Sequence, residues 1–547
     1  MTAYTPHGSP TAPRFLWPLV AAGAAWLLLV TVALMARPLL PVDETRYLAV
    51  AWDMWLSGDL LVPHLNGEAY SHKPPLLFWL INGVWALFGV NDWSGRLVAP
   101  AFALATLPLT YLLGRLIWPD DRFARAYGPL VLAGTATWVM FATLTYFDMM
   151  IGFFTVLGMV GCWCVVRAKP RLGWGVVALA IGLGVLAKGP VILVHVLPPL
   201  VLAPLWQGRQ ALPGITWKRW YLGLVLATVG GAAIALAWAL PAASAGGEDY
   251  GNAILWGQTA GRVANSFAHG QPWWFYGAVL VPMLLPWSFW PSFWRSARAA
   301  RAEKADPGFR FLLVWFIGVT VILSFVSGKQ VHYLLPSVPA VALLVARLLG
   351  RAEERPSRID GLPLGVVLAV LGLGVLLLPL IKHGVVLDPE LAALSNWWGL
   401  GFLALGGGLL FWRPWVAGWR LAGQSGAIVA VLVLVHLIAA PYLAAFHNLK
   451  PTAQWIALAQ DRGLPVANIS KYHGQYHFLG RLKAPIDSVW EHDIGPWLDS
   501  HDTGKVIIYY DGAVPDPLPE FLQPYRSRTI VVRDIDQLHA NPDLVIR

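Results

Sequence analysis

The sequence predicts an all-α membrane protein that crosses the bilayer many times and ends in a small soluble α/β domain. Two features of the composition indicate this class: 57% of the 547 residues are hydrophobic, and only 13% are charged. A water-soluble chain would carry about 25% charged residues. The third observation is the spacing of the charges, which leaves apolar runs long enough to cross a hydrocarbon core of about 30 Å. A water-soluble globular protein is therefore excluded.

The apolar runs predict the membrane spans in order. The first covers residues 15–36, which are 22 positions without a charge. It ends at Arg37 without a small-residue cleavage site, so we expect a retained span and not a cleaved signal. The further runs of spanning length are 97–115, 126–147, 149–166, 172–187, 189–206, 221–243, 273–293, 311–327, 333–349, 362–381, 397–412 and 427–445.

One apolar stretch, 74–90, is short and begins with two prolines. The distribution of basic residues decides whether it crosses, because Lys and Arg accumulate in inside loops. If the stretch lies along the interface, the inside segments hold 21 Lys and Arg and the outside segments hold 8. A crossing would invert every later segment and place the five basic residues of 295–310 outside. We therefore predict an interfacial segment here, about 13 transmembrane helices, and an inside N-terminus.

The chain changes character after the last span. Charged residues become frequent and apolar runs become short, as in a soluble domain. Strands are expected at 464–469, 505–510 and 529–532, with a helix near 451–460. The expected division is a membrane domain over 1–446, with outer-loop interfacial helices in 38–92, and an outer α/β domain over 447–547.

The candidate functional residues stand at span ends that the predicted topology places at one membrane face. Asp148 and Lys188 are nearly the sole charges in long apolar stretches. At that depth an ionisable group costs roughly 2.5–3.5 kcal/mol, so a functional site is the default hypothesis. The candidates are Asp43, Glu44, Arg46, Tyr47, Lys73, Asp148, Lys188, Arg262, His269, Lys329, His332 and Tyr333.

These residue types indicate a chemistry. A cluster of cations suits a lipid phosphate, through charge-assisted hydrogen bonds. Carboxylates beside it, Asp43 and Asp148, suit a base or a sugar-binding group. Other polar residues are expected to be ordinary ones: Arg37, Arg96 and Lys382 as span-end residues, and His473 and His477 as surface residues of the soluble domain.

Five motifs carry a resemblance to a known family. They are Asp43-Glu44-x-Arg46-Tyr47, His72-Lys73-Pro74-Pro75, Asp148, Ala187-Lys188-Gly189-Pro190 and His332-Tyr333-Leu334-Leu335-Pro336. Together they resemble the polyprenyl-phosphate-dependent glycosyltransferases of the GT-C fold, which include the protein O-mannosyltransferases and the lipid A aminoarabinose transferases. The thirteen spans and the small α/β domain make the chain similar to the aminoarabinose transferases in particular. His72 departs from the pattern of many relatives, which have an acidic residue before Lys-Pro.

The resemblance implies a Gram-negative inner-membrane enzyme that transfers 4-amino-4-deoxy-L-arabinose from undecaprenyl phosphate to lipid A phosphate on the periplasmic side, an activity that gives polymyxin resistance. It implies catalytic roles for Asp43 and Asp148. The implied substrate-binding residues are Lys73, Arg46, Arg262 and Tyr333 on the polyprenyl phosphate, Lys188 and Lys329 on the donor or acceptor phosphate, and Glu44, Tyr47, His269 and His332 nearby. No cofactor is implied, a divalent metal ion is neither required nor excluded, and we expect a monomer among membrane lipids that binds no nucleic acid.

Two alternatives stay open at this stage. The first is transfer of a sugar to protein hydroxyls or to another envelope glycan. A hydroxyl acceptor needs a base, which Asp43 would supply, whereas a lipid A phosphate is already an oxyanion and needs only orientation. The second is a lipid flippase or transporter, which would carry polar residues at the midplane of several spans. In this sequence the charges gather at the outer face instead.

Overall fold

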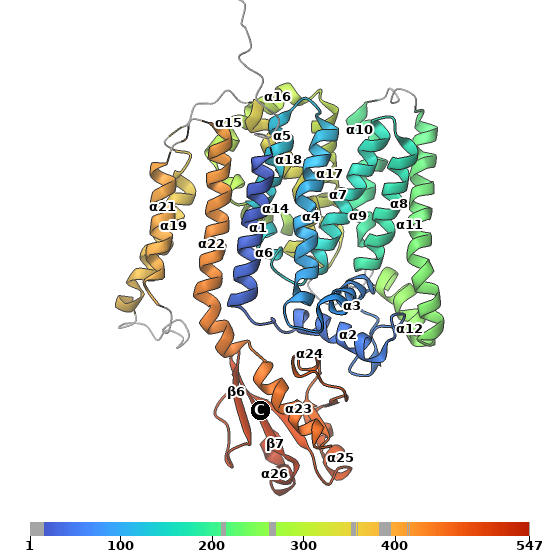
Figure 1. Ribbon diagram of the computed structural model, residues 1–547, viewed down its shortest axis with the longest axis vertical. Helices are drawn as coiled ribbons and strands as arrows, with labels where there is room; N and C mark the ends of the chain where they lie inside the picture. The colour runs from blue at the N-terminus through green and yellow to red at the C-terminus, as the bar shows by residue number, and fades with distance from the viewer. Residues whose placement is uncertain are drawn as a thin grey trace, which may run out of the picture.

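The computed structural model describes residues 16–208, 215–261, 270–351, 357, 359–381, 395–412, 414 and 416–545. These residues form a bundle of long helices with a small sheet-containing domain at one end, and two helices of the first outer loop lie between them (Figure 1). Two connections rich in arginine, residues 115–125 and 295–301 with three arginines each, lie at the opposite end of the bundle. These two connections and the C-terminal domain are therefore at opposite ends.

Eight helices in the described part of the chain are long and apolar enough to cross a membrane. They are α1 (Trp17–Ala36), α4 (Ser94–Ile117), α7 (Phe147–Val166), α8 (Pro170–Lys188), α11 (Trp217–Ala245), α17 (Pro307–Phe325), a 3₁₀ turn (Val331–Ser337) continued by α18 (Val338–Arg351), and α22 (Ala417–Phe446). Further apolar helices are α9 (Val191–Val201), α19 (Leu362–Ile381) and α21 (Trp398–Phe411). The class of multi-span helical membrane protein is confirmed. The count of thirteen spans stays a prediction.

Three of the expected runs are interrupted in the structure. The run 189–206 divides at Leu202 into α9 and α10 (Ala203–Gln207), and two others have longer breaks. The run 126–147 divides into α5 (Arg122–Ala133), α6 (Ala136–Phe141) and an irregular segment, and the run 273–293 divides into α14 (Phe275–Met283), a 3₁₀ turn and α15 (Pro291–Ser296). The two longer breaks face each other, because the Ala136 N–H donates to the Leu285 carbonyl over 2.8 Å. Hydropathy misses such breaks because it does not report which backbone groups bond to a neighbouring segment. The remaining short helices are α12 (Glu248–Asn252) and α16 (Ala300–Glu303).

Burial distinguishes central from peripheral helices. α7 is buried along most of its length, whereas α11 exposes large apolar side chains such as Leu226 and Val229, both 60% exposed. Exposed apolar faces of this extent fit lipid contact and not water. α7 packs closely on α8 where two glycines meet, since a Cβ on Gly161 would lie 2.8 Å from the Gly173 carbonyl oxygen. Such small residues allow helix backbones to approach in a membrane.

The segment between α1 and α4 forms a layer between the helix bundle and the C-terminal domain. It contains α2 (Asp43–Ser57), a two-stranded hairpin of β1 (His64–Leu65) and β2 (Glu68–Ala69), and α3 (Leu76–Phe88). The 13 residues of α3 reach only about 20 Å at 1.5 Å per residue, which is short of a hydrocarbon core. An interfacial position for this stretch agrees with that length. α2 packs on α3, so both belong to one layer.

The C-terminal region folds around a five-stranded sheet in the order β4-β3-β5-β7-β6. β3 (Val466–Ile469) runs parallel to β4 (Asp487–Val489) and β5 (Lys505–Tyr510), while β7 (Arg528–Asp534) is antiparallel to β5 and β6 (Phe521–Tyr525). The helices are α23 (Lys450–Asp461), α24 (His477–Gly480), α25 (Ile494–Asp499) and α26 (Ile535–Ala540). The three expected strands and the expected helix are confirmed. The edge strands β4 and β6 were not predicted from the sequence because both are only partly buried and therefore lack a continuous apolar run. β6 also contains Pro524.

The buried carboxyl of Asp53, on α2, predicts how the stability of the protein depends on pH. Burial raises the pKa of Asp53 from 3.8 to about 6, although a hydrogen bond from the Asn66 N–H, 2.8 Å long, acts in the opposite direction. A carboxyl with a raised folded-state pKa binds its proton more tightly in the folded state, so stability falls as the pH rises from about 4 through 6.

We therefore expect Asp53→Asn to raise the free energy of unfolding at pH 7.5 by up to about 3 kcal/mol, because the amide still accepts the hydrogen bond without a buried charge. At pH 4 the variant and the wild type should have equal stability. Denaturant unfolding of the detergent-solubilised protein at the two pH values measures the difference. Equal stability at pH 7.5 would show that Asp53 is well solvated in solution.

Candidate active site

Two adjacent carboxylates open α2, and the fold gives them different surroundings. Asp43 and Glu44 occupy the first helical turn, where negative charge is favourable beside unpaired backbone N–H groups. Successive residues on a helix point about 100° apart. The Asp43 side chain is 39% exposed and the Glu44 side chain only 1%. The Asp-Glu pair therefore holds one open and one buried carboxylate.

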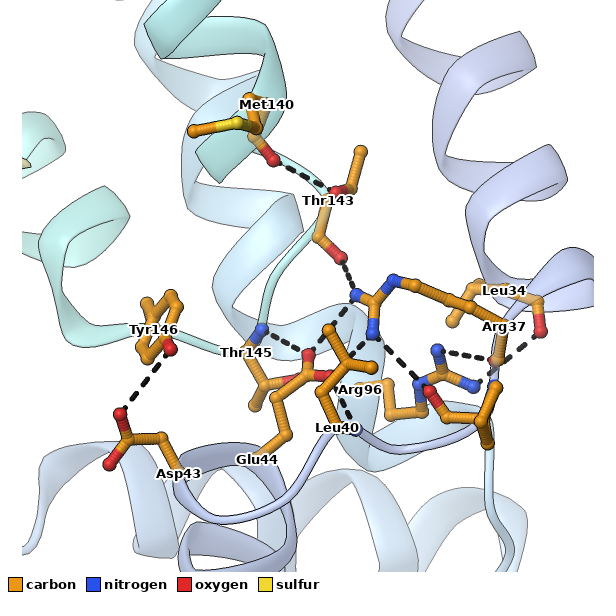
Figure 2. A network of polar contacts seen from close by, with 11 residues as sticks. Leu34, Arg37, Leu40, Asp43, Glu44, Arg96, Met140, Thr143, Thr145 and Tyr146 are labelled. Atoms are coloured by element: carbon orange, nitrogen blue, oxygen red, sulfur yellow. Dashed lines mark hydrogen bonds and ion pairs between the residues drawn. The ribbon is translucent and has the colours of Figure 1, made fainter. Parts of the chain in front are cut away.

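Glu44 lies at the centre of a buried polar network (Figure 2). Its carboxylate pairs with Arg37, just after α1, and accepts from the Leu40 N–H at 3.1 Å and the Thr145 N–H at 2.8 Å. Arg37 also donates to the Thr143 carbonyl over 2.6 Å. The network thus joins the end of α1, the start of α2 and the irregular segment before α7. This explains why the run 126–147 leaves the helical conformation near its end.

The electrostatics of Glu44 support a structural role. Burial alone would raise the pKa of its carboxyl, but the charge and hydrogen bond of Arg37, with Arg96 and the Thr145 N–H, lower it from 4.5 to about 2. Arg37 and Arg96 were expected to be ordinary span-end residues, and that expectation is wrong. Both are buried, and Arg96 donates to the Arg37 carbonyl over 3.1 Å. We propose that Glu44 positions the site and does not contact substrate.

Asp43 faces the open side of the same layer. Its Oδ1 pairs with Arg46 one turn later and lies 3.4 Å from the Tyr47 hydroxyl. The Tyr146 hydroxyl donates to its Oδ2 over 3.3 Å (Figure 2). Burial raises the pKa of Tyr146, and the Asp43 and Glu44 charges add to this, so the phenol stays protonated as a donor. Asp43 is thus oriented by three side chains and remains partly open to a ligand.

The second carboxylate, Asp148, stands in the first turn of α7. Lys188, at the end of α8, places its Nζ 2.6 Å from Asp148 Oδ1, and His332 Nε2 lies 3.8 Å from Oδ2. The Lys188 ammonium also lies 5.2 Å from the centre of the Tyr333 ring. The consecutive helices α7 and α8 therefore meet the distant 3₁₀ turn before α18 at one charged cluster.

Aromatic side chains connect the two carboxylates. Tyr146, which donates to Asp43, stacks on His332 with 6.3 Å between ring centres and 4° between planes. Lys73 lies with its Nζ 5.8 Å from the centre of the Phe147 ring, and its charge acts on Asp148. The site is therefore one continuous arrangement of two acids, several cations and aromatic rings.

Lys188 gives a direct test of the Asp148 pairing. Replacing it by methionine keeps most of the side-chain volume but leaves Asp148, 6% exposed, without its short hydrogen bond. We expect the free energy of unfolding to fall by about 2 kcal/mol, the typical cost of losing a hydrogen bond to a buried charge. The double variant Asp148→Asn/Lys188→Met should recover part of that loss. Thermal unfolding in detergent measures both, and additive losses would contradict a direct pair.

Lys329 is predicted from sequence to bind substrate, and in the structure its ammonium group contacts a backbone carbonyl. The side chain is buried, with the whole residue 4% exposed, and its Nζ donates to the Gln271 carbonyl over 2.7 Å. Gly270 and Gly328 form a β-bridge beside this contact. Lys329 thus ties Gln271 to the segment that precedes the 3₁₀ turn before α18. A role in contacting phosphate stays a prediction.

The structure brings most of the predicted residues to one membrane face. Asp43, Arg46, Tyr47, Lys73, Asp148, Lys188, His332 and Tyr333 contribute to the charged and aromatic arrangement. Arg262, His269 and Lys382 lie outside the described residues. Within the described part of the chain, no group of three or more His, Cys, Asp or Glu side chains could hold a metal ion.

Sequence analysis did not identify every residue that contributes to the site, and it misplaced one histidine of the C-terminal domain. Tyr146 orients Asp43, yet its only sequence signal is its place two residues before Asp148. His477 was expected at the domain surface, and this is wrong, because it is 2% exposed and its Nδ1 lies 2.7 Å from the Tyr472 hydroxyl. Burial lowers the pKa of His477 to about 4. It is a neutral core histidine.

Comparison with known proteins is consistent with this architecture. Residues 17–245 match the family model described as dolichyl-phosphate-mannose-protein mannosyltransferase. The undecaprenyl phosphate-alpha-4-amino-4-deoxy-L-arabinose arabinosyl transferase of Pseudomonas paraeruginosa is 33% identical over 355 residues, which are 62% of this chain and 61% of that one. The enzyme of the same name from Pseudomonas savastanoi pv. phaseolicola is 32% identical over 382 residues, covering 66% of this chain and 67% of the relative.

The crystal structure of ArnT from Cupriavidus metallidurans bound to undecaprenyl phosphate has the same fold. The TM-score is 0.75 at 19% sequence identity, over 95% of this chain and 98% of that one. The apo structure of that protein gives a TM-score of 0.73. This shared fold, taken together with the family model and the Pseudomonas relatives, is that of the GT-C glycosyltransferase class.

The chain belongs to the family of the undecaprenyl phosphate-alpha-4-amino-4-deoxy-L-arabinose arabinosyl transferases. The alignment with the Pseudomonas paraeruginosa relative spans 61% of that relative's length. Family membership therefore rests on the aligned part, and the activity and substrates of the whole protein are matters for proposal.

Proposed function

We propose that this protein transfers 4-amino-4-deoxy-L-arabinose from undecaprenyl phosphate to a phosphate of lipid A. One observation carries the proposal: an open carboxylate, Asp43, shares one membrane face with the cations Arg46, Lys73 and Lys188. A lipid-linked sugar phosphate needs cations for its phosphate and a carboxylate near its sugar. The names of the Pseudomonas relatives supply the sugar and the carrier.

The proposed reaction is a direct displacement at the anomeric carbon. The acceptor phosphate oxygen forms the new bond to the sugar, and the bond to the undecaprenyl phosphate oxygen breaks with inversion, as in inverting glycosidases. Lys73, Lys188 and Arg46, with the Tyr333 hydroxyl, stabilise the negative charge that grows on the leaving phosphate. Arg262 and Lys329 are further candidates for phosphate contacts. Arg46 and Lys188 now pair with carboxylates, so a bound phosphate would compete for them.

Asp43 has a different task from that of a base. An acceptor phosphate is already an oxyanion near neutral pH and does not require deprotonation. We propose that Asp43 orients the acceptor or binds the amine of the sugar, with Tyr47 and Tyr146 holding its carboxylate in place. Asp148 would act through Lys188 and His332, which it positions.

The proposed location is the Gram-negative inner membrane with the site facing the periplasm. The arginine-rich connections at the opposite end of the bundle support this orientation, because basic loops stay on the cytoplasmic side. The periplasm lacks ATP, so a lipid-linked sugar would serve as the energy source. We also propose that residues 1–446 act as the transferase domain, that 447–547 form a periplasmic domain, and that the protein works as a monomer.

The direct test is mass spectrometry of lipid A from Gram-negative cells that make the donor, with and without this gene. We expect an aminopentose on a lipid A phosphate only in cells that carry the gene. Restoring the gene on a plasmid should restore the modification. Unmodified lipid A in both strains would contradict the proposal. It would favour a protein or glycan acceptor, to which the protein mannosyltransferase family model points.

A further inference from the structure

The C-terminal domain is docked directly on the layer that carries Asp43. The Trp52 indole N–H, on α2, donates to the Leu482 carbonyl over 2.8 Å. The hairpin residue Asn66 exchanges two 2.8 Å hydrogen bonds with the backbone of Ile486. Arg526 donates to the Pro41 carbonyl over 2.7 Å, two residues before Asp43. The domain therefore contacts both ends of the segment that positions the open carboxylate.

One loop of this domain lies closest to the site helix. It runs from Ser470 to Tyr476, between β3 and α24, and Gly474 in it has a φ of +75°. A Cβ built on Gly474 would lie 3.3 Å from the Cβ of Ala49 and 2.4 Å from a methyl carbon of Leu65. Ala49 is one helical turn after Arg46, so the two residues share a face of α2. The loop is thus pressed against α2 one turn from the site.

Buried hydrogen bonds hold the loop in this shape. The Tyr472 hydroxyl contacts the buried His477 and accepts from the Tyr476 N–H over 3.2 Å. The Tyr472 N–H donates to the Ser488 hydroxyl over 3.1 Å. The His473 N–H donates to the Gln475 side chain over 3.0 Å. A loop fixed in this way can present its outward side chains in one place, as a preorganised binding site requires.

Two side chains of the loop, Lys471 and His473, carry nitrogen donors. Lys471 is exposed, and His473 is half-buried. Burial lowers the pKa of His473, the charges of Arg46 and Lys471 lower it further, and Asp43 acts in the opposite direction. These three charged groups therefore lie within electrostatic reach of the imidazole. His473 is neutral near pH 7 and can donate one N–H to an anion.

We propose that Lys471 and His473 bind the phosphate group of the acceptor and position it at Asp43, which makes the C-terminal domain a part of the site. This inference rests on the proposed function, since it names residues for the lipid A acceptor. An ammonium and a ring N–H together suit a phosphate. The domain that carries the loop lies on the side of α2 away from the helix bundle (Figure 1), whereas Lys188, at the end of α8, pairs with Asp148 of α7 within the bundle.

The test is steady-state transfer by the full-length purified protein, with undecaprenyl phosphate-linked aminoarabinose and lipid A varied in turn. Both single variants, Lys471→Ala and His473→Ala, should raise KM for lipid A about tenfold, the effect of losing one charge-assisted contact. Their KM for the donor and their kcat should stay near the wild-type values. Lys471→Arg, which keeps the charge, should restore the wild-type KM for lipid A.

A matched control is available in the same domain. His492→Ala removes a histidine that is 78% exposed in the turn after β4, and it should leave every constant unchanged. If the wild type transfers sugar to lipid A and the loop variants keep its acceptor KM, this inference is wrong and the proposed function stands. If both KM values and the melting temperature change together, the loop has a merely structural role and the inference is also wrong. If the wild type does not modify lipid A, the proposed function fails and the inference fails with it.

Discussion

Replacing Asp43 by asparagine is expected to lower kcat about a hundredfold, the scale on which a misplaced reactant slows a reaction. The amide keeps the shape and still accepts from Tyr146, but it loses the negative charge that pairs with Arg46. Because the Asp43 side chain is 39% exposed, the protein should remain folded. The measurement is transfer to lipid A by purified protein, together with its melting temperature.

The matched control for Asp43→Asn is Asp502→Asn, which changes an exposed aspartate of the C-terminal domain in the same way and should keep full activity. Full transfer by Asp43→Asn would show that the open carboxylate is dispensable, and the assignment of the site would then move to Asp148. Loss of activity together with a lower melting temperature would point instead to a folding defect.

Replacing the neighbouring Glu44 by glutamine should have the opposite pattern, with a large effect on stability. The Arg37 side chain is 2% exposed and would keep its charge without a counter-ion. Breaking a buried ion pair from one side typically costs about 3–5 kcal/mol. We expect a correspondingly lower free energy of unfolding, measured by denaturant titration in detergent. A variant as stable as the wild type would show that water or lipid headgroups solvate Arg37.

The same pair predicts how stability depends on pH. The folded-state pKa of Glu44, about 2, lies below its ordinary value of 4.5. A depressed carboxyl pKa gives stability that is present above pH 4.5 and is lost as the pH falls towards 2. The loss amounts to about 3 kcal/mol over this range. Glu44→Gln should be less sensitive to acid over the same interval, and an identical acid dependence in both proteins would contradict the assignment.

The two carboxylates show which features of the site can be predicted from the sequence and which cannot. The sequence identifies Asp43-Glu44 as one motif, but it does not show which of the two carboxylates is exposed and which is buried. The distinction arises because Arg37 and the Thr145 N–H, from segments on either side, converge on Glu44 alone. Burial depends on neighbours brought together by the fold. Tyr146 escaped notice for the same reason.

The membrane class and the α/β character of the C-terminal region follow from the sequence itself, and the interfacial position of residues 74–90 stays a prediction. Hydropathy and charge distribution are local properties, and the solvent, either lipid or water, acts on each segment separately. The strands at β3, β5 and β7 were predicted because β3 and β5 are fully buried and β7 largely so. Short edge strands carry no comparable pattern.

Composition and charge spacing are enough to predict a membrane protein of many helices whose acids and cations gather at one end of the bundle. The pairing of Asp148 with Lys188, the burial of Glu44 and the contact of the His473 loop with the helix of Asp43 become visible only in the folded protein. This difference arises from the range of the interactions. The hydropathy of a segment depends on residues that are close together in the sequence. Ion pairs and contacts between domains join residues as far apart as Pro41 and Arg526.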